Sequence, residues 1–116
     1  MSNFLYLFRG GDENFNVLSQ EEKQAHMEVW ATWMGGLTEE GRLVDGLPLG
    51  ADGKVVENRG EMITDGPFAE GAKIVGGYLI VSAKDLNEAV EISKGCPIFD
   101  YEGSTVEVRE IMSMDM

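Results

Sequence analysis

The chain has 116 residues, of which 43% are hydrophobic and 26% are charged, a composition typical of a globular domain and not of a disordered or fibrous protein. Nine Lys and Arg residues against 21 Asp and Glu residues give a formal net charge of -12, so we expect neither nucleic acid nor an anionic membrane as a partner. No apolar run approaches the roughly 20 residues that span a bilayer, and the N-terminus carries no basic leader. We therefore expect a cytoplasmic protein with a single domain over residues 1–116.

The chain has a single cysteine, Cys96, and a single histidine, His26. One cysteine excludes an intrachain disulfide and a thiolate metal cluster, and one histidine excludes a metal site with several imidazole ligands in one chain. No loop has the carboxylate spacing that binds calcium. The sequence therefore indicates neither a metal ion nor a cofactor.

Two apolar runs predict the central strands of a sheet. Residues 4–8 read Phe-Leu-Tyr-Leu-Phe, and residues 75–83 are also apolar on both faces of an extended chain. Residues 42–50, interrupted by Gly46 and Pro48, and residues 104–111, which alternate apolar and polar side chains, are predicted edge strands. A short hairpin arm is predicted between the edge strand 42–50 and the central strand 75–83, where residues 54–57 and 61–64 flank a turn.

The first helix is predicted from its capping residues. Ser19 followed by Glu22 has the spacing of a capping box, and Gly41 is a typical C-terminal stop. His26 lies on the apolar stripe of this helix, which follows i, i+3 and i+4 spacing. The glycine pair at residues 35–36 would weaken the helix by about 1 kcal/mol per glycine, so its last turns either fray, kink or continue.

A second capping pattern, Asp85 followed by Glu88, predicts a short helix that ends at Gly95 before Pro97. The predicted order is then strand, helix, strand, hairpin arm, strand, helix, strand. Two right-handed βαβ crossovers that interleave their strands give an α+β fold, the ferredoxin-like βαββαβ plait, with the hairpin arm as an insertion. Both helices are expected on one face of the sheet.

The opposite face of this sheet is expected to be apolar, because both central strands are apolar on both sides. A contiguous exposed apolar patch larger than a few hundred Å² is rare in soluble monomers. We therefore predict a homodimer that packs sheet on sheet through the open face.

Several motifs in order along the chain resemble those of the YCII-related, DGPF-domain family. They are Asp65-Gly66-Pro67-Phe68-Ala69-Glu70, Gly76-Gly77-Tyr78, Asp85-Leu86-Asn87-Glu88-Ala89, Gly95-Cys96-Pro97-Ile98 and Val106-Glu107-Val108-Arg109. The resemblance runs from about residue 5 to residue 111. It implies a ferredoxin-like dimeric α+β barrel and a His-Asp site in a cleft near the sheet. Some members of this family act on chlorinated aromatic ring-cleavage or quinone intermediates, and others occur beside extracytoplasmic sigma factors.

Carried over by position, the resemblance makes His26 and Asp65 the candidate catalytic residues. The chain departs from the family pattern at residues 71–74, where members often have Thr-Lys-Glu after the signature glutamate, and at Glu110, where members have proline. These departures concern the rim of the expected pocket and the last strand.

His26 and Asp65 each have a structural and a functional interpretation. A histidine on an apolar stripe is either a packed core residue or a group that transfers protons near neutral pH. Asp-Gly-Pro is turn chemistry, but an Asx turn at Asp65 would need the N–H of residue 67, which is a proline. Asp65 must therefore find another partner: the Phe68 N–H, a ligand, or the ring of His26, whose tautomer it would then orient.

The candidate substrate-binding residues are Phe68 and Tyr78, which would line a cleft for a planar ligand, and Arg42 and Arg109, which could hold an anionic group. Packing accounts equally well for the two aromatic residues, and surface ion pairing is the better explanation for either arginine. Trp30 and Trp33 fit the core better than a pocket wall. Cys96 follows a helix C-terminus, where the dipole disfavours a thiolate, so we do not expect a nucleophile there.

Two functions fit this pattern. The first is a cofactor-independent enzyme of lyase or isomerase type that acts on a small molecule, with His26 as acid or base and Asp65 as its orienting partner. The alternative is a non-catalytic module that binds a small ligand or has a regulatory role. The family members found beside sigma factors suggest this alternative. Binding of a ligand without its conversion would distinguish the second from the first.

Overall fold

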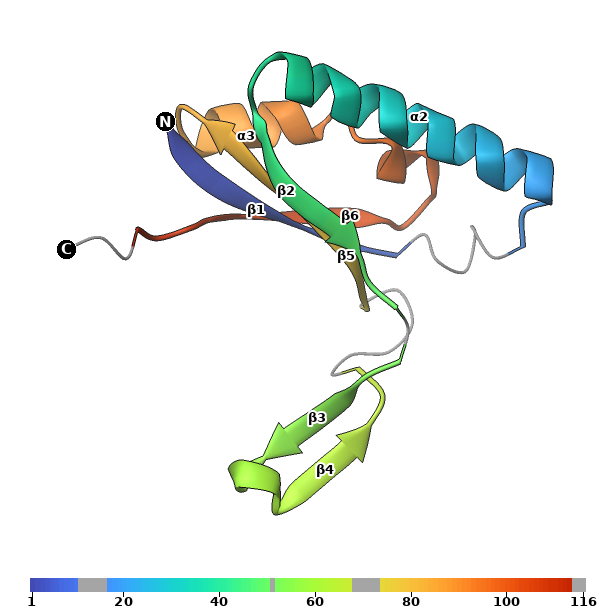
Figure 1. The fold of residues 1–116 in the computed structure, drawn as a ribbon, viewed down its shortest axis with the longest axis vertical. Helices are drawn as coiled ribbons and strands as arrows, with labels where there is room; N and C mark the ends of the chain where they lie inside the picture. Colours follow the sequence, from blue (N-terminus) through green and yellow to red (C-terminus); the bar gives the residue numbers. More distant parts are fainter. Residues whose placement is uncertain (11–16, 51, 68–73, 114–116) are drawn as a thin grey trace.

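A computed structural model of the chain describes residues 1–10, 17–50, 52–67 and 74–113. The order of elements matches the predicted plait with its hairpin arm (Figure 1). Two short 3-10 helices, Asn58–Gly60 and Pro97–Asp100, accompany the main elements. The main elements are β1 (Ser2–Arg9), α2 (Gln20–Glu39), β2 (Leu43–Pro48), β3 (Lys54–Glu57), β4 (Met62–Asp65), β5 (Val75–Ala83), α3 (Leu86–Ser93) and β6 (Thr105–Glu110).

The four-stranded sheet has the order β2-β5-β1-β6, and each neighbouring pair is antiparallel. The two apolar runs, β1 and β5, are the central strands, and β2 and β6 are the edges, as predicted. Figure 1 shows α2 and α3 on one side of this sheet. The ferredoxin-like α+β fold is therefore confirmed, with β3 and β4 forming a separate two-stranded arm.

Local signals set the limits of α2. The Ser19 hydroxyl accepts a hydrogen bond from the Glu22 N–H at 3.1 Å, and the Glu22 carboxylate accepts one from the Ser19 N–H at 3.2 Å, which completes the capping box. The helix continues through the glycine pair, and the Glu40 N–H donates to the Gly36 carbonyl. The helix ends at Glu39, and Gly41, just after the C-cap residue Glu40, has a φ of 73°, the left-handed conformation that glycine adopts without strain.

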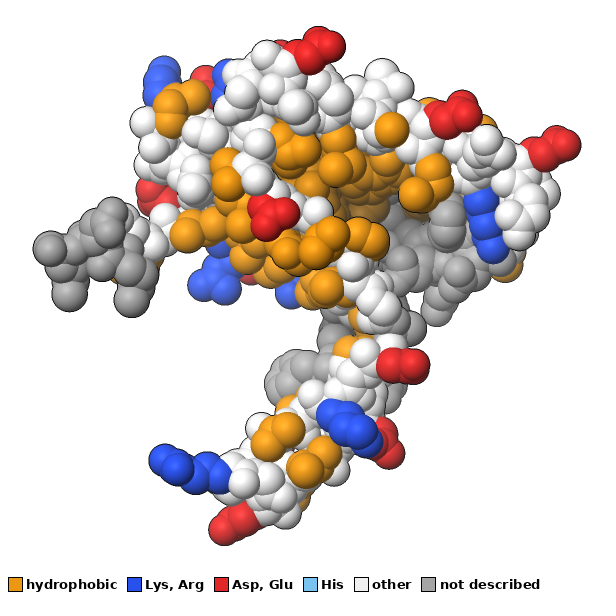
Figure 2. Space-filling view, in the orientation of Figure 1, with side chains coloured by type: hydrophobic (Ala, Val, Ile, Leu, Met, Phe, Trp, Pro, Cys, Tyr) orange, Lys and Arg blue, Asp and Glu red, His pale blue; other side chains and the backbone are white. Residues whose placement is uncertain are grey.

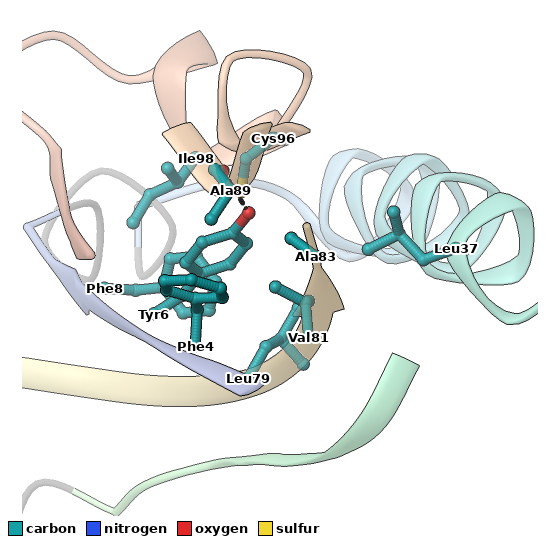
Figure 3. Packing of buried hydrophobic residues seen from close by; sticks show 10 residues of the cluster. All are labelled: Phe4, Tyr6, Phe8, Leu37, Leu79, Val81, Ala83, Ala89, Cys96 and Ile98. Atoms are coloured by element: carbon teal, nitrogen blue, oxygen red, sulfur yellow. Dashed lines mark hydrogen bonds between the residues drawn. The ribbon is translucent and has the colours of Figure 1, made fainter. Parts of the chain in front are cut away.

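Alternate side chains of the central strands form the core beneath the helices (Figure 3). Phe4 and Tyr6 of β1 and Val81 of β5 are fully buried. The Tyr6 hydroxyl donates a hydrogen bond to the Ala89 carbonyl and thereby ties β1 to α3. Burial raises the pKa of the Tyr6 phenol well above its usual range, so it stays neutral and keeps this bond.

The β3–β4 arm lies away from the rest of the chain. Asn58 and Arg59 turn the chain with φ of 50° and 58°, and the Gly66 N–H donates to the Gly53 carbonyl at the base of the arm. In Figure 1 the arm extends on the side of the sheet opposite the helices. The radius of gyration is 15.8 Å, whereas a compact chain of this length has about 13 Å. Over the described residues, no helix combines the length and the apolar character needed to cross a bilayer.

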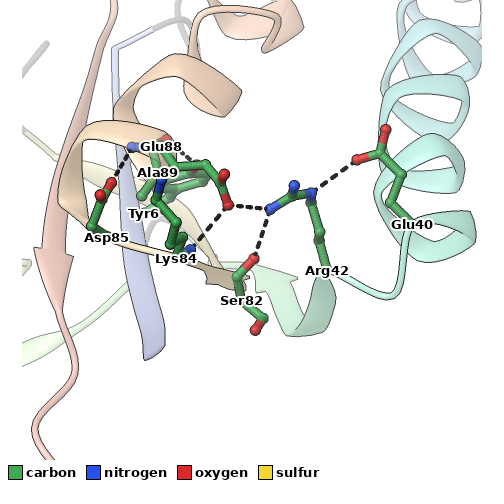
Figure 4. A network of polar contacts seen from close by, with 8 residues as sticks. All are labelled: Tyr6, Glu40, Arg42, Ser82, Lys84, Asp85, Glu88 and Ala89. Atoms are coloured by element: carbon green, nitrogen blue, oxygen red, sulfur yellow. Dashed lines mark hydrogen bonds and ion pairs between the residues drawn. The ribbon is translucent and has the colours of Figure 1, made fainter. Parts of the chain in front are cut away.

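A polar network joins the start of β2 to α3 (Figure 4). The Arg42 guanidinium donates to the carboxylates of Glu88 at 2.8 Å and Glu40 at 3.0 Å, and to the Ser82 carbonyl at 3.3 Å. Glu88 also accepts from the Lys84 N–H at 2.9 Å. The hydrogen bond from Arg42 is the main cause that lowers the pKa of Glu88, and the same bond raises the pKa of Arg42.

The Arg42–Glu88 pair predicts a pH-dependent contribution to stability. Because the pKa of Glu88 is lowered on folding, its charge stabilises the fold above the unfolded-state pKa, and this contribution is lost as the pH falls through the folded-state pKa. A Glu88→Gln variant should therefore unfold at a lower temperature than the wild type at pH 7, with the difference shrinking below about pH 4. Thermal unfolding from pH 7 to pH 3 measures this difference, with Glu102→Gln as the matched control. A difference that stays constant with pH would contradict the proposed role of the pair.

Candidate functional site

A pocket of about 270 Å³ lies between α2 and the sheet. Figure 2 shows the apolar hollow that opens beneath α2. Its walls are apolar or aromatic, with the rings of Phe8, Trp30 and Tyr101 among them, and His26 is part of the wall. Among the described residues that line the pocket, none is an Asp, Glu, Lys or Arg. The described part of the lining therefore offers apolar and aromatic surface with one imidazole in it.

Glycines keep the floor of this pocket open where β2 pairs with β5. A Cβ atom on Gly46 would lie 2.2 Å from the Leu79 Cδ2 and 2.7 Å from the Tyr78 carbonyl oxygen. A Cβ atom on Gly77 would lie 3.3 Å from the Leu47 carbonyl oxygen. Without side chains at these two positions, the strands approach closely and leave space between themselves and α2. Gly46, which the sequence marks as an interruption of a strand, is thus part of the construction of the pocket.

His26 lies in the N-terminal half of α2, one turn before Trp30. The Trp30 indole Nε1–H donates a hydrogen bond to His26 Nε2 at 2.7 Å. An indole nitrogen can only donate, so Nε2 must be the acceptor and the proton of the neutral imidazole lies on Nδ1. In the neutral imidazole the bond therefore selects the Nδ1–H tautomer, with the Nε2 lone pair directed at the indole.

Tyr101 completes the aromatic surroundings of the imidazole. Its ring centroid lies 4.8 Å from that of His26, with the planes at 54°, and it follows the 3-10 helix Pro97–Asp100. The pKa of Tyr101 is raised, first by burial and then by the negative charges of Asp100 and Glu22. Its phenol is therefore protonated at neutral pH and can donate a hydrogen bond.

Asp65 lies on the arm and not beside His26. Its side chain is 90% exposed and its carboxylate forms an ion pair with Lys54, the residue opposite it in the β3–β4 register. The Lys54 ammonium therefore takes the place of the backbone N–H that Pro67 cannot donate to Asp65. Within one chain the structure does not bring Asp65 and His26 together, and a joint catalytic role for them stays a prediction.

The other predicted site residues lie in different parts of the molecule. Tyr78 lines the pocket. Arg42 is held in its network with Glu40 and Glu88, and Arg109 is an exposed residue of β6 opposite Leu5. Phe68 lies outside the described residues. The roles of these residues in binding a substrate stay predictions.

Cys96 is buried, and this burial raises the pKa of its thiol to about 12. The thiol is therefore neutral at physiological pH, in keeping with the expectation that it is no nucleophile. Over the described residues, no group of three or more His, Cys, Asp or Glu side chains could hold a metal ion.

Two residues of the site were missed by sequence reasoning. Trp30 packs against the core, as expected, but it also lines the pocket and binds His26. Its i+4 spacing from His26 is the signal that could have indicated this contact. Tyr101 has no such signal, because a 3-10 turn without regular periodicity brings it to the pocket.

Comparison with known proteins establishes the family. A family model described as the YCII-related domain matches residues 6–115. The chain belongs to the YCII-related family. Among the solved structures that resemble this YCII-related protein is 5-chloro-2-hydroxyhydroquinone dehydrochlorinase from Burkholderia phenoliruptrix, in complex with 2,5-dihydroxybenzoquinone. The TM-score is 0.53, with 14% sequence identity and 90% of each chain covered. At this identity the likeness shows the fold alone. A search of curated proteins gives no match.

The close packing at Gly46 of this YCII-related chain predicts that two glycine substitutions change the free energy of unfolding in opposite directions. Gly46→Ala should lower the free energy of unfolding by about 1–3 kcal/mol, because the new methyl group overpacks against the backbone of β5. Gly36→Ala, in α2 with no atom within 4 Å of the added Cβ, should raise it by up to about 1 kcal/mol. Urea denaturation of both variants measures the two changes. Equal effects of the two substitutions would contradict the close approach at Gly46.

The Trp30 hydrogen bond predicts the tautomer of His26. At a pH where the imidazole is neutral, the wild type should carry its proton on Nδ1, and Trp30→Phe should increase the Nε2–H population because the indole donor is lost. Two-bond ¹⁵N–¹H correlation spectra report this, since the chain has one histidine. Trp33→Phe is the matched control and should leave the tautomer unchanged. A wild-type protein with the proton on Nε2 would contradict the assigned geometry.

Proposed function

We propose that this protein binds a small, mostly apolar ring compound in the pocket and transfers a proton on it through His26, without a cofactor. The observation that carries this proposal is the placement of an imidazole, held as a proton acceptor by Trp30, in the wall of an otherwise apolar pocket. Histidine is the side chain whose ordinary pKa suits proton transfer near neutral pH. The reaction class is that of a lyase or isomerase.

The size and lining of the pocket support a single-ring compound. Its volume of about 270 Å³ is near the lower end of ligand pockets, which span about 300–1,000 Å³. The rings of Phe8, Trp30 and Tyr101 offer aromatic surface, while the imidazole and the Tyr101 phenol offer polar contacts. A protein of the same fold was solved with 2,5-dihydroxybenzoquinone, which makes hydroxylated quinones reasonable first probes.

The proposed proton transfer begins with the neutral imidazole. The compound enters the pocket and its acidic C–H or O–H replaces the Trp30 N–H as the donor to Nε2 of His26. The proton moves to Nε2, which leaves an imidazolium and an anionic intermediate. Return of the proton to another atom completes an isomerisation. In a lyase reaction, departure of a leaving group with its electron pair completes an elimination, and the imidazolium releases its proton to solvent.

This proposal predicts a loss of turnover in a His26→Gln variant. The glutamine amide can still accept the Trp30 hydrogen bond but cannot take a proton, so binding should persist while turnover falls by about 10²–10⁴-fold. Hydroxylated single-ring quinones and lactones are screened by thermal shift, and products are then detected by mass spectrometry. Glu28→Gln, on the exposed side of α2, is the control and should retain full activity. Full turnover in His26→Gln would refute the acid–base role. Asp65→Asn tests separately whether the carboxylate on the arm assists.

A second candidate function is a binding module without catalysis. It is favoured by the carboxylate of Asp65, which pairs with Lys54 rather than with His26 in one chain. In that case the same probes bind in the pocket, depend on Trp30 and Tyr101, and are recovered unchanged.

A further inference from the structure

The phenol of Tyr101 is a polar group in the pocket wall with no hydrogen-bond partner in the described part of the chain. Its ring lies 4.8 Å from that of His26, centroid to centroid, and both side chains line the pocket. Over the described residues, no group exchanges a hydrogen bond with the Tyr101 hydroxyl. A half-buried phenol in this position can bind a polar group of the ligand.

The proton transfer proposed for His26 creates a negative charge in the pocket. When Nε2 takes a proton from a neutral compound, the compound becomes an anion, and no Lys or Arg lies in the described wall. An anion in apolar surroundings is strongly unfavourable unless hydrogen bonds compensate it. A donor aimed at the atom that gains the charge is therefore the group that such a reaction needs most.

Four side chains in the described wall carry an N–H or O–H group: His26, Trp30, Tyr78 and Tyr101. The Trp30 N–H is directed at His26 Nε2, where the proton is taken. Tyr78 alternates with the core residue Leu79 in β5, so its ring lies on the open face of the sheet. The Tyr101 hydroxyl is the remaining side-chain donor of the described wall beside the imidazole.

We infer that Tyr101 is a second catalytic residue, whose hydroxyl donates a hydrogen bond to a carbonyl oxygen of the compound while His26 takes a proton from the adjacent carbon. The two protein rings are neighbours, which suits a carbonyl and a C–H on adjacent atoms. The pair therefore selects a class of substrate, the enolisable ring ketones and lactones. This inference rests on the proton transfer proposed for His26 and adds the group that receives the charge.

In this step the Nε2 lone pair of His26 takes the proton, and the electron pair of the C–H bond forms a carbon–carbon double bond. The π pair of the carbonyl moves to oxygen, which becomes an enolate O⁻ that accepts the hydrogen bond from Tyr101. Tyr101 keeps its proton, because burial and the charges of Asp100 and Glu22 raise the pKa of its phenol. Return of the proton from the imidazolium to carbon completes the exchange.

Binding of 4-nitrophenolate, a ring oxyanion that mimics the enolate, tests the hydroxyl without turnover. The absorbance of the probe reports its dissociation constant at a pH where it is ionised. Tyr101→Phe should raise this constant at least about tenfold, because it deletes a hydrogen bond to a charged group. Nitrobenzene lacks the oxyanion, so its affinity, measured by ligand-observed NMR, should be the same in both proteins. Phe99→Leu, at a 48% exposed residue of the neighbouring 3-10 helix, is the control and should leave both affinities unchanged.

Deuterium exchange at the α-carbon of cyclohexanone in D₂O, followed by NMR, gives the catalytic measurement. His26→Gln should abolish the protein-dependent exchange, and Tyr101→Phe should slow it by about 10²–10³-fold. Exchange that needs His26 but keeps the wild-type rate in Tyr101→Phe would overturn the role of Tyr101 and leave the proposed function intact. A 4-nitrophenolate affinity that falls in Trp30→Phe and not in Tyr101→Phe would overturn it too. Exchange that persists in His26→Gln would refute the proton transfer itself.

Discussion

The packing of the helix-facing side chains of β1 and β5 beneath α2 and α3 is the interaction on which the rest of the structure depends. Each fully buried side chain, such as Phe4 or Val81, contributes about 1.5–3 kcal/mol of hydrophobic free energy. Leu37 joins this core from the C-terminal half of α2. The N-terminal half of α2 carries His26, and there the floor beneath it has glycines at positions 46 and 77. The pocket thus lies beneath the N-terminal half of α2, beyond the part of the helix that packs on the core.

The sequence was sufficient to predict the fold because its signals are local. Two runs apolar on both faces indicated the central strands, and the capping box at Ser19 fixed the start of α2. The site was only partly predictable, because its contacts depend on spatial neighbours. Asp65 was placed with His26 by resemblance, whereas the register of the arm pairs it with Lys54. Tyr101 reaches the imidazole through an irregular turn that no periodicity reveals.

The helices cover one face of the sheet and leave its other face open. Residues such as Leu5 and Ile80 alternate with the core residues and are left on the other face. The arm extends toward that side with its own apolar pair, Val56 and Ile63. The pocket beneath α2 lies on the helix side, so the pocket and the open face are on opposite faces of one sheet.

We propose that a small ring compound binds beside the imidazole that Trp30 holds. Titration of the ¹⁵N-labelled protein with a hydroxylated single-ring quinone, followed by the indole N–H signal of Trp30 and the imidazole signals of His26, tests it most directly. We expect saturable shifts of these signals, because the compound replaces the indole as the hydrogen-bond donor to Nε2. Signals of Trp30 and His26 that stay unchanged while resonances elsewhere shift would contradict it.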